Sequence, residues 1–152
     1  MKKMMFLDLE ETIIRSWQNP TLCNIDYMRY LLANEKVEEV HIFSFAIWNQ
    51  ADKDVFSQRL KPHLEEALGV RIRSWVSVPE VNKVLKQFTG IVMEDWEMIN
   101  VWGKMRAFQD YCRSEYKDME CVLVDDVVPN TAFMVTDDRL MIRTIKAPAL
   151  MD

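Results

Sequence analysis

The sequence is poor in residues that break or cross-link a chain. It holds 3 glycines and 5 prolines among 152 residues, and 49% of its residues are hydrophobic. This composition indicates a chain that buries a core and argues against intrinsic disorder. The 3 cysteines, Cys23, Cys112 and Cys121, are widely spaced and include no CxxC pair. Their spacing argues against a disulfide framework and against a cysteine zinc site.

Long apolar runs and clustered positive charge are also missing. No run approaches the ~20 apolar residues of a membrane-spanning helix, and the apolar segment after Lys2 and Lys3 is too short for a signal peptide. The net charge is −5 and the Lys and Arg residues are scattered. Nucleic acid is disfavoured as a partner because it requires clustered cations. We therefore expect a cytoplasmic protein without a membrane partner, in which a local cation would still allow a small anionic substrate.

Five short apolar segments are typical of strands. They cover residues 4–7, 40–45, 70–76, 121–124 and 139–146. Helical patterns separate most of them, and near-continuous apolar strands indicate a parallel sheet that is covered on both faces. The order predicts one α/β domain over residues 1–152. Its mainly parallel five-stranded sheet would form the middle layer of a doubly wound, three-layer sandwich.

The expected helices carry local start and stop signals. Residues 25–33 form the first. Residues 52–68 form a second, which Pro62 should break or restart and Gly69 should end. Ser77 and Glu80 match a capping box at the start of a third helix, which runs to about residue 88. Apolar residues at helical spacing between 105 and 116 predict a fourth helix, with Lys104 near its start.

Polar residues mark the carboxyl ends of three of the predicted strands. Asp8, Ser44 and Asp125 each lie at the carboxyl end of a strand, and ligands of such sheets bind beyond these ends. A single acid such as Asp8 is more often part of a solvated turn. Two acidic clusters that meet at one sheet edge, however, would repel each other unless a cation joined them. The pair Asp125 and Asp126 therefore favours a cation site.

Four motifs in this order resemble a known superfamily. They are the segment DLEET from Asp8 to Thr12, Ser44 in HIFSF, Lys104 at a helix start, and Asp125 with Asp126 in VLVDDVVPN. The series resembles the haloacid dehalogenase-like (HAD) superfamily of phosphohydrolases. That family has a strand ending in DxDx[TV], a strand ending in Ser or Thr, a helix-leading Lys and a strand ending in acids. The segment LEETII also looks like the DLDETI version found in protein phosphatases of this superfamily.

The resemblance implies a HAD-like Rossmannoid fold and a Mg²⁺-dependent phosphatase. Asp8 would attack the phosphorus of a phosphorylated substrate, a phosphate monoester, and form an aspartyl-phosphate. The metal would bind Asp8, the backbone carbonyl of Glu10 and Asp125, with Asp126 binding through water or orienting these ligands. Ser44 and Lys104 would bind the phosphate. The side chain of Glu10 would serve as general acid and base.

Glu10 departs from the family pattern, which has Asp at this position. The extra methylene moves the carboxyl group, and a misplacement of ~1 Å can cost on the order of 100-fold in rate. Glu10 would therefore act with a shifted backbone, act slowly, or not act. The last case makes the protein a pseudophosphatase, a binding or regulatory module. A third alternative is an unrelated α/β binding module whose acids serve only solubility.

The spacing of the motifs bears on the substrate. Residues 9–43 separate Asp8 from Ser44, and residues 45–103 separate Ser44 from Lys104, which makes 35 and 59 residues. The predicted strands and helices use most of both segments, so we expect a minimal cap or none. Members without a cap act on larger substrates or gain a lid by oligomerising, and a homo-oligomer is one expectation here.

Overall fold

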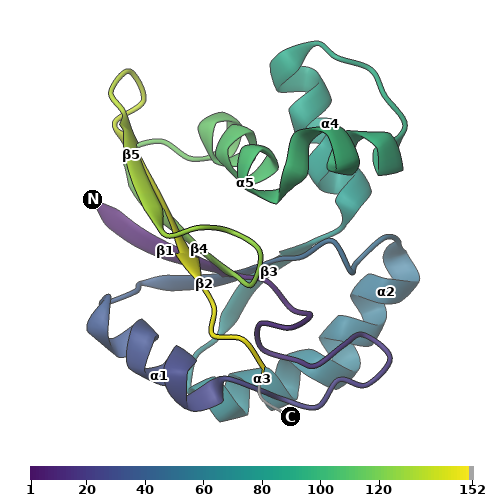
Figure 1. The fold of residues 1–152 in the computed structure, drawn as a ribbon, viewed down its shortest axis with the longest axis vertical. Helices are drawn as coiled ribbons and strands as arrows, with labels where there is room; N and C mark the ends of the chain where they lie inside the picture. Colours follow the sequence, from purple (N-terminus) through teal and green to yellow (C-terminus); the bar gives the residue numbers. More distant parts are fainter. Residues whose placement is uncertain (151–152) are drawn as a thin grey trace.

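The computed structural model describes residues 1–150 and contains a mixed, mostly parallel six-stranded sheet (Figure 1). In sheet order the strands are β3 (Ile72–Val76), β2 (Glu39–Phe43), β1 (Lys2–Leu7), β4 (Met119–Asp125), β6 (Leu140–Lys146) and β5 (Thr131–Val135). All neighbouring strands are parallel except β5 and β6. The predicted α/β class with a mainly parallel sheet is therefore confirmed.

The prediction of five strands is wrong, because β5 adds a sixth strand at the edge of the sheet. Every second residue of β5 is exposed, so the strand lacks the continuous apolar run that marks a strand buried on both faces. A turn that includes Asp137 and Asp138 leads from β5 into β6, and the two strands pair antiparallel. The edge position explains why the apolar pattern of β5 is weak.

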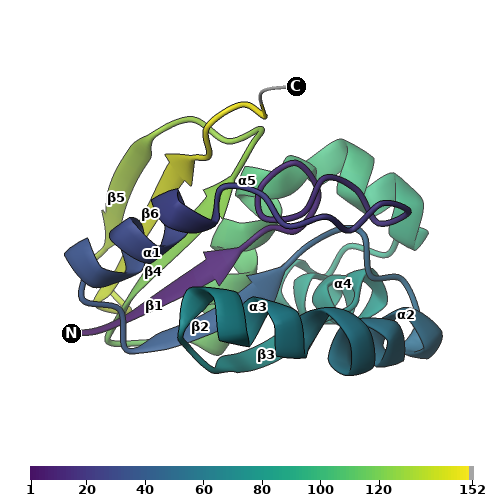
Figure 2. The same ribbon diagram turned by 90° about the horizontal axis from the view of Figure 1, so that it is seen from below.

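Helices lie on both sides of the sheet (Figures 1 and 2). One side carries α1 (Ile25–Asn34), α2 (Gln50–Val55), the π-helical segment η1 (Phe56–Leu60) and α3 (Lys61–Leu68), and the other carries α4 (Val78–Thr89) and α5 (Asp95–Glu115). Two buried apolar clusters follow from this arrangement. Met28 and Val122 belong to the first, and Phe6 and Phe108 belong to the second.

Local signals set the ends of two helices as expected. The Ser77 hydroxyl accepts from the Glu80 backbone N–H and the Glu80 carboxylate accepts from the Ser77 backbone N–H, so the capping box is confirmed. Gly69 ends α3 in the left-handed conformation. Of the two outcomes expected at Pro62, a break or a restart, the structure shows a restart: α3 begins at Lys61, directly after α2 and η1. Pro62 lies in the first turn of α3, where a proline is well tolerated.

The helix that carries Lys104 is longer than predicted and is divided. It begins at Asp95, but Gly103 inside it has φ 75° and ψ 163°, which is not helical. A positive φ favours glycine because a Cβ would clash with the backbone. Lys104 consequently begins the second helical segment of α5. The apolar spacing in the sequence predicted only this second segment.

The two central strands, β1 and β4, position the candidate site. Residues Met4 to Leu7 of β1 and Cys121 to Asp125 of β4 are buried. The register pairs Leu7 with Val124, so the residues that follow both strands leave the sheet side by side. None of the helices in residues 1–150 combines the length and the apolar character needed to cross a bilayer.

Candidate active site

Three carboxylates meet where β1 and β4 end. Asp8 follows β1 directly, and its backbone N–H donates to the Val124 carbonyl oxygen at 3.0 Å. Asp125 is the last residue of β4. Carboxylate oxygens of Asp8, Asp125 and Asp126 lie within 4.8 Å of one another. The structure thus brings together two acidic motifs that are more than 100 residues apart in the sequence.

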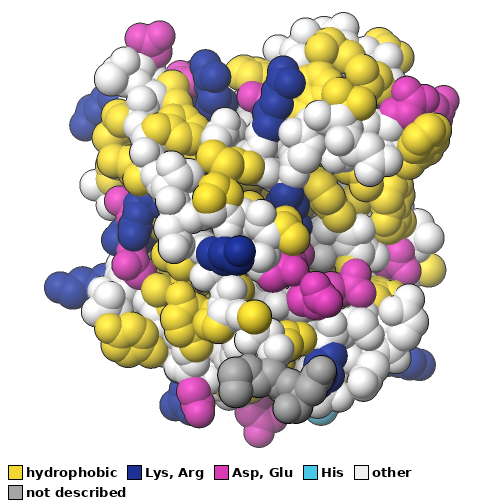
Figure 3. Space-filling view, viewed as in Figure 1, with side chains coloured by type: hydrophobic (Ala, Val, Ile, Leu, Met, Phe, Trp, Pro, Cys, Tyr) yellow, Lys and Arg dark blue, Asp and Glu magenta, His cyan; other side chains and the backbone are white. Residues whose placement is uncertain are grey.

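These carboxylates line a pocket of about 250 Å³. Its wall also includes Glu10, Glu11, Ser44, Phe45, Ala46, Lys104 and Val127. Every site residue predicted from the sequence therefore lines the same pocket. Figure 3 shows acidic side chains gathered near the centre of the face viewed there, with Lys and Arg side chains among them.

Lys104 places a positive charge in this pocket. Its Nζ lies 3.0 Å from Asp8 Oδ1 and 3.1 Å from Asp125 Oδ2, and the centre of the Phe45 ring is 4.6 Å away. Burial by itself would lower the pKa of Lys104, but attraction by Asp8 and Asp125 outweighs burial and raises the pKa. Lys104 is therefore held as an ammonium ion between the two carboxylates.

Asp8 is buried and bonded through both oxygens. Oδ1 accepts from Lys104, and Oδ2 accepts from the Thr12 hydroxyl at 3.1 Å. A tight turn brings Thr12 there, because the backbone N–H groups of Thr12 and Ile13 both donate to the Leu9 carbonyl oxygen. Burial raises the pKa of Asp8; Lys104 opposes this rise, and repulsion by Asp125 adds to it.

Asp125 has a buried oxygen without a hydrogen-bond donor. Oδ1 accepts from the Val127 backbone N–H at 2.8 Å. Oδ2 is close enough to Lys104 for an ion pair, but the alignment is not that of a hydrogen bond. Buried polar atoms are nearly always hydrogen-bonded in native proteins. Oδ2 is thus paired with Lys104 by charge, and its remaining lone pair can bind a cation in the pocket.

Asp126 completes the acidic group at the pocket mouth. Burial, repulsion by Asp8 and Asp125, and a hydrogen bond with Glu11 together raise the pKa of Asp126 to about 7. Two of the three carboxylates, those of Asp8 and Asp125, share the ammonium group of Lys104. A bound divalent cation would compensate the negative charge of these neighbouring carboxylates. Because all three residues offer carboxylate oxygens, the group fits a hard cation.

Ser44 follows β2 and lies in the same pocket, as its position after a strand predicted. It is buried, and its Oγ accepts from the Ala46 backbone N–H at 3.1 Å. A hydroxyl that accepts one hydrogen bond keeps its own hydrogen for another partner. Ser44 can therefore donate to an anion in the pocket while the Ala46 amide fixes the position of its oxygen.

The Glu10 carboxylate is directed to the chain that follows β1. Its Oε2 accepts from the backbone N–H of Trp17 at 2.8 Å, and the backbone of Glu10 forms a bridge with Ile14. Glu10 still contributes to the pocket wall. The resemblance assigns the Glu10 side chain to acid and base chemistry, whereas in this structure one of its two oxygens is used by a backbone amide.

Glu11 is a site residue that sequence reasoning missed. It lines the pocket, hydrogen-bonds to Asp126 and has a positive φ of 61°. A positive φ in a residue other than glycine is uncommon and often marks a constrained turn. The run of acids in DLEET was the only sequence signal, and it does not tell which of the two glutamates turns toward Asp126.

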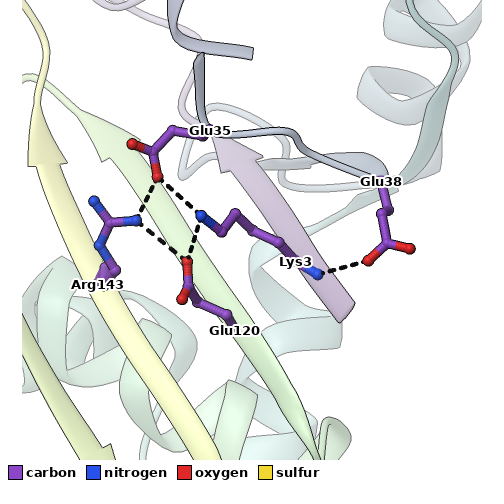
Figure 4. Close-up of polar contacts among 5 residues, drawn as sticks. All are labelled: Lys3, Glu35, Glu38, Glu120 and Arg143. Atoms are coloured by element: carbon purple, nitrogen blue, oxygen red, sulfur yellow. Dashed lines mark hydrogen bonds and ion pairs between the residues drawn. The ribbon is translucent and has the colours of Figure 1, made fainter. Parts of the chain in front are cut away.

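A second charged cluster lies near the amino ends of β1 and β4 (Figure 4). There Lys3 Nζ lies 3.3 Å from Glu35 and 3.0 Å from Glu120, and Arg143 contacts the same two glutamates. Glu38 accepts from the Lys3 backbone N–H at 3.0 Å. The two cations and the two shared carboxylates balance each other, so this amino-end cluster (Lys3, Glu35, Glu120 and Arg143) needs no further ion.

Comparisons with known proteins do not assign the chain to a family. Comparison with protein-family models, with curated proteins and with solved structures finds no match to the chain. The resemblance to HAD-like phosphohydrolases therefore depends on the four motifs and on their meeting in one pocket.

Proposed function

We propose that the protein is a Mg²⁺-dependent phosphohydrolase of the HAD-like type that acts through an aspartyl-phosphate on Asp8. The observation that carries the proposal is the pocket in which Asp8, Asp125 and Asp126 meet the ammonium group of Lys104. A nucleophile, a cation site and a fixed positive charge are the parts that phosphoryl transfer requires. Ser44, which lines the same pocket, adds a hydrogen-bond donor.

The proposal includes the finer description of the fold, a doubly wound HAD-like Rossmannoid with a minimal cap or none. Parallel strands in the order β3-β2-β1-β4-β6 and helices on both faces support it. The residues between Ser44 and Lys104 are used by α2, η1, α3, β3, α4 and the first part of α5. An open pocket suits a larger phosphorylated substrate or one that a second copy of the chain covers.

Each residue has a role in the first step. Asp8, the backbone carbonyl of Glu10 and Asp125 would hold Mg²⁺, with Asp126 binding through water or orienting these ligands. The bound ion would offset the negative charge of a phosphate dianion beside the nucleophile. A carboxylate oxygen of Asp8 attacks phosphorus, an acyl phosphate bond forms, and the ester P–O bond breaks. The leaving oxygen keeps the electron pair of that bond and takes a proton from Glu10 or from water. Lys104 neutralises charge on the phosphoryl oxygens, and the Ser44 hydroxyl donates to one of them. Water then attacks phosphorus, which releases inorganic phosphate and restores the Asp8 carboxylate.

A second candidate keeps the cation site and lacks turnover. It is a catalytically weak or inactive binding and regulatory module, a pseudophosphatase. The bond between Glu10 Oε2 and the Trp17 amide favours it, because this bond engages the side chain expected to move protons. Such a module would bind Mg²⁺ and phosphate mimics without releasing phosphate.

The test is a panel of phosphate monoesters assayed for phosphate release with Mg²⁺ and with EDTA. We expect release that requires Mg²⁺ and that Asp8→Asn abolishes. Turnover that survives Asp8→Asn would remove the nucleophile assignment. A thermal shift with Mg²⁺ or beryllofluoride but without turnover would favour the pseudophosphatase. No shift and no turnover would leave the third reading, an α/β module whose acids serve solubility.

A further inference from the structure

The loop that follows β1 is the part of the chain next to the pocket that the proposed mechanism does not explain. This loop, residues 11–23, is fixed near its two ends by backbone bonds. Arg15 N–H donates to the Thr21 carbonyl at 2.9 Å, and Cys23 N–H donates to the Ile13 carbonyl at 2.9 Å. Its tip is a turn whose bonds between Ser16 and Asn19 are internal.

One side-chain bond connects this tip to the pocket wall. Glu10 lines the pocket, and its Oε2 accepts from the Trp17 N–H at 2.8 Å. The length of glutamate is what makes this bond, because an aspartate at position 10 would fall short by about one C–C bond, ~1.5 Å. The residue that departs from the DxD pattern is thus the residue whose extra methylene reaches the loop.

We infer that the Glu10 carboxylate is a positioning group that holds loop 11–23, and that it does not carry protons in the reaction. The inference rests on the proposed function and concerns the substrate class of the same site. General acid and base catalysis typically increases the reaction rate ~10²–10⁴-fold. A site without it is slower by this factor unless the substrate is more reactive. The substrate is more reactive when its leaving group is stable as an anion.

The bond changes in the first step follow from this. The Asp8 oxygen bonds to phosphorus, the P–O bond to the leaving group breaks, and the leaving oxygen departs with the electron pair and takes no proton from Glu10. Aryl phosphates and acyl phosphates release weakly basic oxyanions, whereas alkyl phosphates release strongly basic alkoxides. The site therefore acts on aryl and acyl phosphates in preference to alkyl phosphates. Water that attacks the aspartyl-phosphate gives its proton to solvent or to the departing phosphate, so this second step is slow.

The first experiment measures leaving-group dependence with Mg²⁺ for the wild type. The substrates are 4-nitrophenyl phosphate, phenyl phosphate and glycerol 2-phosphate. We expect kcat/KM to fall by more than about 100-fold across this series, and a burst of 4-nitrophenol to precede slower steady-state release. Equal rates for the aryl and alkyl esters would overturn the substrate class.

The second experiment separates a positioning role from proton transfer. Glu10→Gln keeps an oxygen that can accept from Trp17 but cannot carry a proton at neutral pH, and Glu10→Ala lacks both abilities. We expect Glu10→Gln to stay within about threefold of wild type on 4-nitrophenyl phosphate, with the same pH profile. Glu10→Ala should lose about 10-fold or more, since misplacement of a site by ~1 Å is costly. A loss of about 100-fold in Glu10→Gln would identify Glu10 as the proton carrier and overturn the inference, while the phosphohydrolase assignment would remain.

A third readout needs no turnover. Amide hydrogen exchange at Trp17 should be slow in the wild type and in Glu10→Gln, and at least about 10-fold faster in Glu10→Ala. Unchanged exchange in Glu10→Ala would show that Glu10 does not hold the loop, whatever the activity. If no phosphate ester is turned over, the proposed function and the substrate class both fail, and the exchange result alone decides the positioning role.

Discussion

Charged residues gather at both ends of the central strands, and the two gatherings differ in balance and burial. The amino-end cluster pairs two cations with two carboxylates, and its side chains are 14–28% exposed. At the carboxyl end Lys104 lies between Asp8 and Asp125, whose side chains are 9% and 1% exposed, with Asp126 beside them. In the first arrangement the positive and negative charges balance each other. In the second arrangement, the two buried carboxylates of Asp8 and Asp125 are paired with the one ammonium group of Lys104.

The pKa shifts at the two ends run in opposite directions. A hydrogen bond from Arg143 holds the pKa of Glu35 below its ordinary value. At the other end, burial raises the pKa of Asp8, with Lys104 only partly offsetting it. Acids alone therefore do not mark a functional site in this protein. The candidate site is distinguished by the burial of its acids, because buried negative charge is costly to keep without a partner.

The largest expected effect is on turnover at the carboxyl end. Asp8→Asn removes the nucleophile while it conserves the shape of the side chain, and we expect phosphate release to fall by at least about 1,000-fold. The matched variant Glu35→Gln makes the same chemical change in the amino-end cluster and should stay within about twofold of wild type. A similar loss of activity in both variants would mean that the two clusters do not differ in function.

The next effect is on stability when each cluster loses a cation. Lys104→Met leaves buried carboxylates uncompensated and should lower the free energy of unfolding in EDTA by about 3–5 kcal/mol. Lys3→Met should cost about 1 kcal/mol or less, because its partners are partly exposed and Arg143 still contacts both. Urea unfolding measures both, and excess Mg²⁺ should recover part of the loss only for Lys104→Met. Equal costs for the two variants would contradict the contrast in burial.

A smaller effect follows from the raised pKa of Asp126. Its value in the folded protein is about 7, against 3.8 as its ordinary value. In this interval the folded state binds more protons than the unfolded chain, so the free energy of unfolding falls as the pH rises from about 4 to about 7. In EDTA, Asp126→Asn should therefore raise the melting temperature at pH 7.5 by roughly 2–4 °C relative to wild type.

The same change should act differently when metal is present. Mg²⁺ should raise the melting temperature of wild type at pH 7.5 and should raise that of Asp126→Asn less, because one ligand is lost. Melting scans at pH 5 and pH 7.5, with EDTA or Mg²⁺, give all of these values. An Asp126→Asn variant that gains as much from Mg²⁺ as the wild type would exclude Asp126 from the cation site.

The convergence of the acids could be predicted from the sequence because it follows from two general rules that do not depend on side-chain packing. Apolar strands that end in polar residues are visible in the letters, and carboxyl ends of parallel strands meet at one edge. Asp8, Ser44 and Asp125 follow from these rules alone. The edge strand β5 could not be predicted in this way, because every second residue is exposed and the strand therefore lacks a continuous apolar run.

The orientation of the two glutamates after Asp8 could not be predicted. Whether Glu10 or Glu11 turns toward Asp126 depends on the positive φ of Glu11 and on the path of the chain to Trp17. Both are set by tertiary contacts and not by the period of the pattern. The break of α5 at Gly103 is similar: the glycine was visible, but the helical segment that begins at Asp95 lacks a strong capping signal, since Glu94 makes no side-chain cap.

The smallest expected effect belongs to the amino-end cluster and has the opposite pH dependence. Because bonding to Arg143 lowers the pKa of Glu35 below 4.5, its contribution to stability is present above pH 4.5 and is lost as the pH falls through the lowered value. Glu35→Gln should therefore lower the free energy of unfolding by ~0.5–1 kcal/mol at pH 7 and low salt, and by less at pH 3 or in 1 M salt. Urea unfolding at these three conditions measures the difference. A cost that grows toward low pH would show that Glu35 behaves like the crowded carboxylates of the other end, and the distinction between a balanced cluster and a cation site would lose its basis.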